Sequence, residues 1–350
     1  MPLPKIFGND WTQFINEWCA GTLPATDQST TELGLNTLFQ FWPEYVQNIV
    51  DKPTKGLILI SQAVHLGLIL EACKSLNGFE KILQRVKSEE RSALSELKFA
   101  EKLIRIGIEP HLEPTLNGKV PDTKIVFFGK EIFFEVIAPE TSEAIKSAEL
   151  EMQEFALELL NIIHGKRIEV FLLQDISIEI REKVKQVVKQ FQKPKLRVEI
   201  PEVAITTIQD EPFDLIITPQ IEKKDSDAVI GIAQINISQE QKTLAIVRLC
   251  ITDSRAKRLL SAESHHFSKA HINILVMDVT KVTGGMKKWM EIIARCLQPN
   301  QNRRFGAVIF FSEGFYVDKV DLKQTWKQVT NEHAYNKVPQ ELLKIIVSGG

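Results

Sequence analysis

Carboxylates inside a β-hairpin pattern are the residues of this sequence best placed for chemistry. The stretch 121-PDTKIVFFGKEIFFEVIAPE-140 contains two strand-like runs around a Gly-Lys turn. Asp122 starts the first run. Glu135 lies inside the second and shares a face with Phe133 and Ile137, because side chains alternate along a strand. A carboxylate in such a place is expensive to bury unless it is hydrogen-bonded, paired or bound to a cation.

The turn folds Asp122 back toward Glu135. Two neighbouring carboxylates repel each other and favour a divalent cation between them, and hard oxygen ligands suit Mg²⁺ or Mn²⁺ better than zinc. Simpler alternatives remain open. Asp122 after Pro121 also fits a turn cap, and Glu135 also fits a solvated or ion-paired strand residue.

The elements that would position these carboxylates indicate an α/β (α+β) fold. Residues 1–87 read as helical, and residues 198–350 alternate strand-like and helical patterns. Between them, a helix at 88–107 precedes strands at 108–114, 123–129 and 131–138, a helix at 141–163 and a strand at 167–174. We therefore expect an N-terminal helical region (1–87), an α-β-β-β-α-β core (88–197) and a C-terminal α/β region (198–350).

Residues 88–175 resemble the PD-(D/E)xK nuclease superfamily, the restriction-endonuclease-like fold, through Pro121-Asp122, Glu135 and Glu96 of the upstream helix. The resemblance implies hydrolysis of phosphodiester bonds in DNA, or less favoured in RNA, in restriction, repair or phage defence. Asp122 and Glu135 would bind Mg²⁺ or Mn²⁺ that activates water, and Glu96 would support the metal site. Periodicity alone leaves Glu101 as an alternative to Glu96, since both flank the apolar stripe of the helix.

One position departs from the family pattern, which has a lysine two residues after the strand glutamate. Ile137 stands there and cannot orient water or stabilise charge on a phosphate. Lys124 is the candidate substitute, because it lies two residues after Asp122 and so on the same face; a solvated lysine is the alternative. The other function left open is a catalytically degenerate module that binds nucleic acid or a protein without cleavage.

A basic segment is the candidate for phosphate contact. The whole chain has 43 Lys and Arg against 45 Asp and Glu, so only a local patch could attract a nucleic acid. The segment 181-REKVKQVVKQFQKPKLR-197 supplies one, although a solvated helix face has the same appearance. Its candidate contacts are Lys185, Lys189, Lys193, Lys195 and Arg197.

The remaining features point to a cytoplasmic protein without a membrane partner. The N-terminus lacks a charged segment followed by an apolar run, as a secretory signal has. The longest apolar run, residues 57–73, contains Ser61, Gln62 and His65 and falls short of a membrane span. Besides nucleic acid, a second copy of the chain or another protein is a candidate partner.

Overall fold

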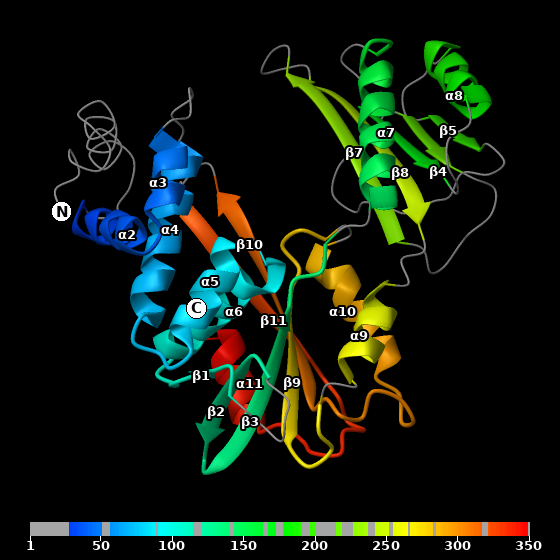
Figure 1. Cartoon of the computed structure of the whole chain (residues 1–350). Helices are drawn as coiled ribbons and strands as arrows, with labels where there is room; N and C mark the ends of the chain where they lie inside the picture. Colours follow the sequence, from blue (N-terminus) through cyan, green and yellow to red (C-terminus); the bar gives the residue numbers. More distant parts are fainter. Residues whose placement is uncertain are drawn as a thin grey trace. The chain divides into compact units, whose positions relative to one another are not determined.

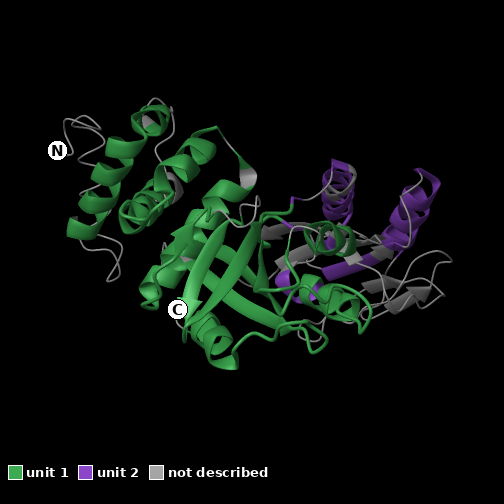
Figure 2. Cartoon of the chain, turned by 60° about the horizontal axis from the view of Figure 1, so that its bottom comes forward, with its two compact units in different colours: residues 1–139, 257–281, 289–350 green, residues 140–256, 282–288 purple. Residues whose placement is uncertain are grey.

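The structure is a computed structural model with a mixed α/β fold. Its residues fall into two compact units, which are coloured separately in Figure 2. Unit 1 comprises residues 1–139, 257–281 and 289–350, and unit 2 comprises residues 140–256 and 282–288. The structure describes residues 28–50, 57–88, 90–114, 121–140, 143–163, 167–172, 178–190, 196–199, 215–218, 227–236, 242–251, 255–264, 267–282, 285–316 and 321–348.

Unit 1 is built on a six-stranded sheet with the strand order β1-β2-β3-β9-β10-β11 (Figure 1). β2–β3 and β10–β11 are antiparallel pairs, whereas β3–β9 and β9–β10 are parallel. The strands are β1 (His111–Leu112), β2 (Thr123–Phe127), β3 (Lys130–Ile137), β9 (Ile272–Asp278), β10 (Ala307–Tyr316) and β11 (Asp321–Thr330).

Helices bury the two faces of this sheet. α6 (Arg91–Arg105) and α11 (Gln340–Ser348) pack on one face, where Phe99 and Leu342 join Phe134 in one apolar cluster. The alternate residues of the strands, such as Phe133, are also buried. In Figure 1, α9 (Arg255–Ser264) and α10 (Gly285–Cys296) lie on the side of β9 away from α5 and α6.

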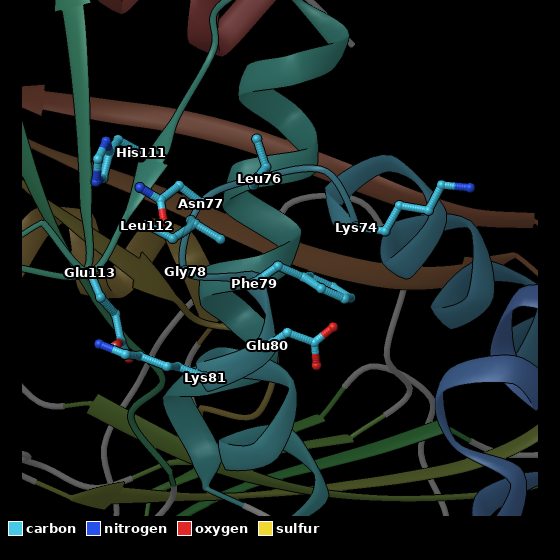
Figure 3. A pocket seen from close by; sticks show the side chains of 10 residues that line it. All are labelled: Lys74, Leu76, Asn77, Gly78, Phe79, Glu80, Lys81, His111, Leu112 and Glu113. Atoms are coloured by element: carbon cyan, nitrogen blue, oxygen red, sulfur yellow. The ribbon is translucent and has the colours of Figure 1, made fainter.

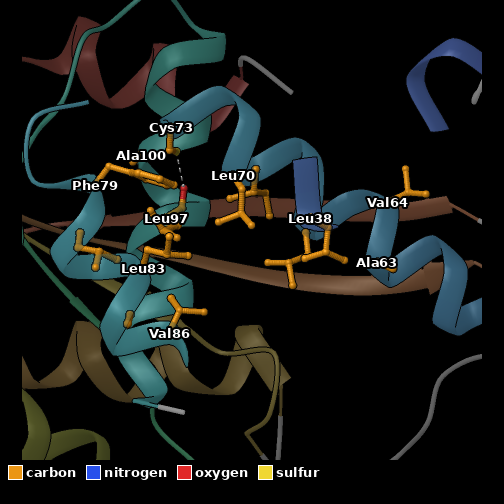
Figure 4. Packing of buried hydrophobic residues seen from close by; sticks show 14 of the residues in the cluster. Leu38, Ala63, Val64, Leu70, Cys73, Phe79, Leu83, Val86, Leu97 and Ala100 are labelled. Atoms are coloured by element: carbon orange, nitrogen blue, oxygen red, sulfur yellow. Dashed lines mark hydrogen bonds between the residues drawn. The ribbon is translucent and has the colours of Figure 1, made fainter. Parts of the chain in front are cut away.

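The N-terminal helices share a core with α6. These are α2 (Gln28–Phe41), α3 (Pro43–Val50), α4 (Leu57–Cys73) and α5 (Phe79–Lys87). Figure 4 shows Leu70 and Leu83 packed with Leu97 of α6, where the Cys73 thiol donates to the Leu97 carbonyl. The expected boundary at residue 87 is therefore wrong. Among the described residues, no helix is long and apolar enough to cross a bilayer.

Unit 2 has its own sheet, in the order β5-β6-β4-β8-β7. α7 (Glu143–Leu160) packs against β7 and β8, and α7 and α8 share an apolar cluster with β4 and β8. The remaining elements are β4 (Arg167–Leu172), α8 (Ile178–Gln190), β5 (Leu196–Glu199), β6 (Leu215–Thr218), β7 (Asp227–Asn236) and β8 (Lys242–Ile251).

The expected core of residues 88–197 is therefore wrong in its second half. β4 belongs to the second sheet, and the strand parallel to β3 is β9. With residues 140–256 left aside, unit 1 runs α6-β1-β2-β3-α9-β9, the expected succession of element types. The sequence pattern misplaced the last two elements because any buried parallel strand preceded by a helix has the same local appearance.

Candidate functional site

Two carboxylates meet across the β2–β3 hairpin. Thr123 pairs with Phe134, so the register carried one residue further places Asp122 opposite Glu135. Side chains opposite each other on antiparallel strands have Cβ atoms about 5 Å apart. The backbone N–H of Val136 donates to Asp122 Oδ2 at 2.6 Å, which fixes the Asp122 carboxylate at this end of the hairpin.

Arg85 of α5 holds a third carboxylate, that of the fully buried Glu96. Its Nη1 and Nη2 donate to Glu96 Oε2 and Oε1, each at 2.9 Å, in a bidentate pair. The same guanidinium donates from Nη1 to Glu113 Oε1 at 3.0 Å and from Nε to Glu90 Oε2 at 2.8 Å. With a further bond from Nη2 to Glu90, every N–H of the guanidinium is directed at a carboxylate.

The carboxylates act on one another electrostatically. Burial raises the pKa of Asp122 well above its usual range, and the charges of Glu96 and Glu135 add to the increase. Burial also raises the pKa of Glu135 to about 7, assisted by Glu263 of α9 and by Glu96. The pKa of Glu96 is raised by burial too, although Arg85 opposes the shift. Protons are thus held here more tightly than on free carboxylates, as expected for buried carboxyls that lie close to other negative charges.

The donor set suits a hard cation held by two protein ligands. Among the described residues, no group of three His, Cys, Asp or Glu side chains is arranged to hold a metal ion. Both oxygens of Glu96 are engaged by Arg85, which leaves Asp122 and Glu135 as the ligand pair. Mg²⁺ is commonly held by one or two carboxylates, with waters and substrate phosphates completing its shell. The raised pKa values also mean that a cation bound here would replace protons.

Lys124 lies on the expected strand, but its ammonium is directed elsewhere. Its Nζ donates to Glu131 Oε1 at 3.0 Å, toward the hairpin turn and away from Glu135. Glu101, the alternative to Glu96, pairs with Arg105 one helical turn away. The structure therefore groups Glu96, Asp122 and Glu135 and leaves Lys124 outside the group.

The basic segment lies in unit 2, where α8 buries Val184 and Val188. Lys185 pairs with Glu158 and Glu182, so its charge is already engaged, and the side chain of Lys189 is exposed. Arg197 lies on β5. Lys193 and Lys195 lie outside the described residues.

Three residues of the site were missed in the sequence: Arg85, Glu113 and Glu263. Glu113 has a positive φ of 46°, an uncommon conformation for a non-glycine residue that often marks functional sites. Its N–H donates to the Asp122 carbonyl at 2.8 Å. No spacing rule signals these residues, because each comes from a different loop or helix.

A hollow of 460 Å³ is bordered by α5 and by residues 111–113 (Figure 3). Glu113 lines it, next to Lys81, whose ammonium is 3.8 Å from Glu113 Oε2. Asp122, Glu135 and Glu96 are not among its lining residues. Glu113 therefore connects the hollow to the carboxylate group through its bonds to Arg85 and Asp122.

Comparison of the chain with protein-family models, with curated proteins and with solved structures gave no match. Its function has to be inferred from the site.

Proposed function

We propose that this protein is a divalent-metal-dependent nuclease that hydrolyses phosphodiester bonds, with Asp122 and Glu135 as the metal ligands. The observation that carries the proposal is the grouping of Glu96, Asp122 and Glu135, three carboxylates from a helix and two adjacent strands, with raised pKa values. Buried carboxyls whose pKa values are raised by one another cluster at functional sites.

The residues divide the work between binding and positioning. Mg²⁺ or Mn²⁺, when bound, would lower the pKa of a water molecule and neutralise charge on the phosphate. Asp122 and Glu135 would hold the ion, and the Val136 N–H keeps the Asp122 carboxylate in place. Arg85 fixes Glu96 and Glu113 behind this pair. DNA is the favoured substrate, with RNA as the alternative.

The first experiment is a calorimetric titration of Mn²⁺ above the pKa of Glu135. We compare the wild type with Asp122→Asn and Glu135→Gln, which keep the side-chain shapes. Glu131→Gln is the matched control, because it removes a carboxylate from the same face of the same strand outside the group. Saturable binding in the wild type and the control, lost in the two ligand variants, is expected. Cleavage of DNA and RNA by the wild type and the control alone would complete the case.

A second candidate function is a module that binds nucleic acid or protein without cutting. Its support is the engagement of the basic side chains near the site. Ile137 stands where the nuclease pattern has a lysine. Arg85 directs its N–H groups at carboxylates, and Lys124 pairs with Glu131. Metal binding that depends on Asp122, with no cleavage of any DNA or RNA, would favour this function. Undiminished Mn²⁺ binding in both ligand variants would contradict the proposed metal site itself.

A further inference from the structure

Three loops of unit 1 meet at one end of its sheet. They precede β9 (267–271), precede β10 (297–306) and follow β11 (331–338). β9 and β10 are parallel and Thr330 pairs with Ala307, so the three loops share the end of the sheet that lies at the bottom of Figure 1. The turn of the β2–β3 hairpin lies at this end too, because Ile132 pairs with Ile272.

Three asparagine side chains lock these loops to one another. The amide of the buried Asn273 donates to the carbonyls of Ser268, His271 and Arg304. The amide of Asn331 donates to the carbonyls of Asn302 and Phe305, at 3.0 and 2.9 Å. The amide of Asn336 donates to the carbonyls of Lys269 and His271, at 2.8 and 2.9 Å. Loops are usually the mobile parts of a fold, whereas these form a fixed support.

This support presents an aromatic ring close to two cations. Tyr335 is 44% exposed. The Arg303 guanidinium carbon lies 4.4 Å from the centroid of its ring, and Lys269 Nζ lies 5.4 Å from the same centroid. The Tyr335 N–H donates to the Arg303 carbonyl at 2.8 Å, and Arg303 Nε donates to the His333 carbonyl at 2.9 Å. The side chains are thus held ready for a ligand that stacks.

The platform, defined as Lys269, Arg303 and Tyr335, is positively charged. The three loops contain four lysine and arginine residues and one glutamate, in a chain whose net charge is −2. Lys337 pairs with that glutamate, Glu332, at 3.3 Å, whereas Lys269 and Arg303 form no ion pair within the described part of the chain. A locked aromatic surface with two such cations matches a ligand that has flat rings and phosphates.

We propose that the platform binds single-stranded nucleic acid. An unpaired base stacks on the Tyr335–Arg303 surface, and Lys269, on its flexible stem, moves to a neighbouring phosphate. β9 begins at Ile272, next to the loops, and Glu135 pairs with Leu275 three residues later. The carboxylate group therefore lies about 10 Å along the sheet from the start of β9. The identity of the partner rests on the proposed function, but binding requires no metal and no cleavage.

Binding of a fluorescein-labelled oligothymidine, measured by anisotropy in EDTA over a range of salt concentrations, tests the platform. The variants are Tyr335→Ala, Tyr335→Phe and the double variant Lys269→Gln/Arg303→Gln. The control Lys323→Gln/Lys344→Gln removes two exposed lysines elsewhere on unit 1. We expect Tyr335→Ala to weaken binding about tenfold and Tyr335→Phe to retain it. The double variant should lower the salt slope by about 0.7, for the one single-strand phosphate contact that Lys269 makes.

Each outcome bears on the platform separately from the nuclease. Equal binding by Tyr335→Ala and the wild type, preference for a duplex, or equal competition by polyglutamate or phosphatidylserine vesicles would overturn the platform. Absence of wild-type binding would overturn it too, while the Mn²⁺ titration would still decide the metal site. Platform-dependent binding in a protein that cleaves nothing would support the platform and count against the nuclease.

Discussion

Two carboxylate sites meet α6 from opposite sides and differ in what surrounds them. Glu96 and Lys98 are two residues apart and therefore point about 200° apart around the helix. Glu96 faces the group with Asp122 and Glu135, where the pKa of each carboxyl is raised. Lys98 faces Glu313 of β10, whose pKa is lowered to about 2.

The difference lies in the partners, because burial raises the pKa of a carboxyl at both sites. At Glu313 this effect is outweighed by His65, whose Nε2 lies 3.5 Å from Glu313 Oε1, by the charge and hydrogen bond of Lys98, and by the Gln324 amide at 3.0 Å. These partners come from α4, α6 and β11, so the Glu313 site fastens helices to the sheet. In the Glu96 group, Arg85 lowers the pKa of each carboxyl, but all three pKa values remain above their usual range. The Glu313 site therefore serves the fold, whereas the Glu96 group keeps acidic oxygens that release their protons when a cation binds.

The largest expected effect comes from breaking the Glu313 site. Lys98→Met leaves the buried Glu313 carboxylate without its cation and should lower the free energy of unfolding by about 3 kcal/mol. Chemical denaturation measures the loss. Lys98→Met/Glu313→Gln, which removes both charges, should recover most of it. A single variant as stable as the wild type would show that the lowered pKa of Glu313 has another origin.

The loss of stability at acidic pH should depend on the same Glu313 site. The pKa of Glu313 is lowered from 4.5 to about 2, so its contribution is fully present above pH 4.5 and is lost as the pH falls through 2. We expect a loss of about 2 kcal/mol over this window from this group, measured by thermal unfolding across pH. Glu313→Gln should be less stable at neutral pH and show a flatter acid limb. An unchanged limb would contradict the assignment.

The Glu96 group should respond to charge removal in the opposite sense. The pKa of Glu135 is raised from 4.5 to about 7, so the stability contributed by its proton is present below 4.5 and lost as the pH rises through 7. Glu135→Gln should therefore stabilise the metal-free protein by about 1 kcal/mol above pH 7 while abolishing Mn²⁺ binding. Glu131→Gln is the matched control in thermal unfolding. Destabilisation by Glu135→Gln would indicate a structural role like that of Glu313.

The sequence predicted the hairpin and the element types well, because both follow from local patterns. The β2–β3 turn, the α6 stripe and the opposition of Asp122 to Glu135 need only alternation and helical periodicity. The same patterns could not show that unit 2 interrupts the core, since the β3–β9 pairing joins strands that are distant in the chain. They also could not find Arg85 or Tyr335, because the roles of these residues depend on loops brought together by the tertiary fold.

The smallest effect concerns the exposed Glu131 of β3, which pairs with Lys124 of β2 at 3.0 Å. Exposed pairs are screened by water and contribute little, so a double-mutant cycle of Lys124→Ala and Glu131→Gln should give a coupling below about 1 kcal/mol. This exposed pair is the reference for the two buried sites.

Mn²⁺ titrations of the same variants test whether Lys124 affects the metal site. If Lys124→Ala changes Mn²⁺ affinity while Glu131→Gln does not, the Lys124 ammonium must reach the Asp122 carboxylate in solution, and the lysine missing at position 137 has a substitute after all.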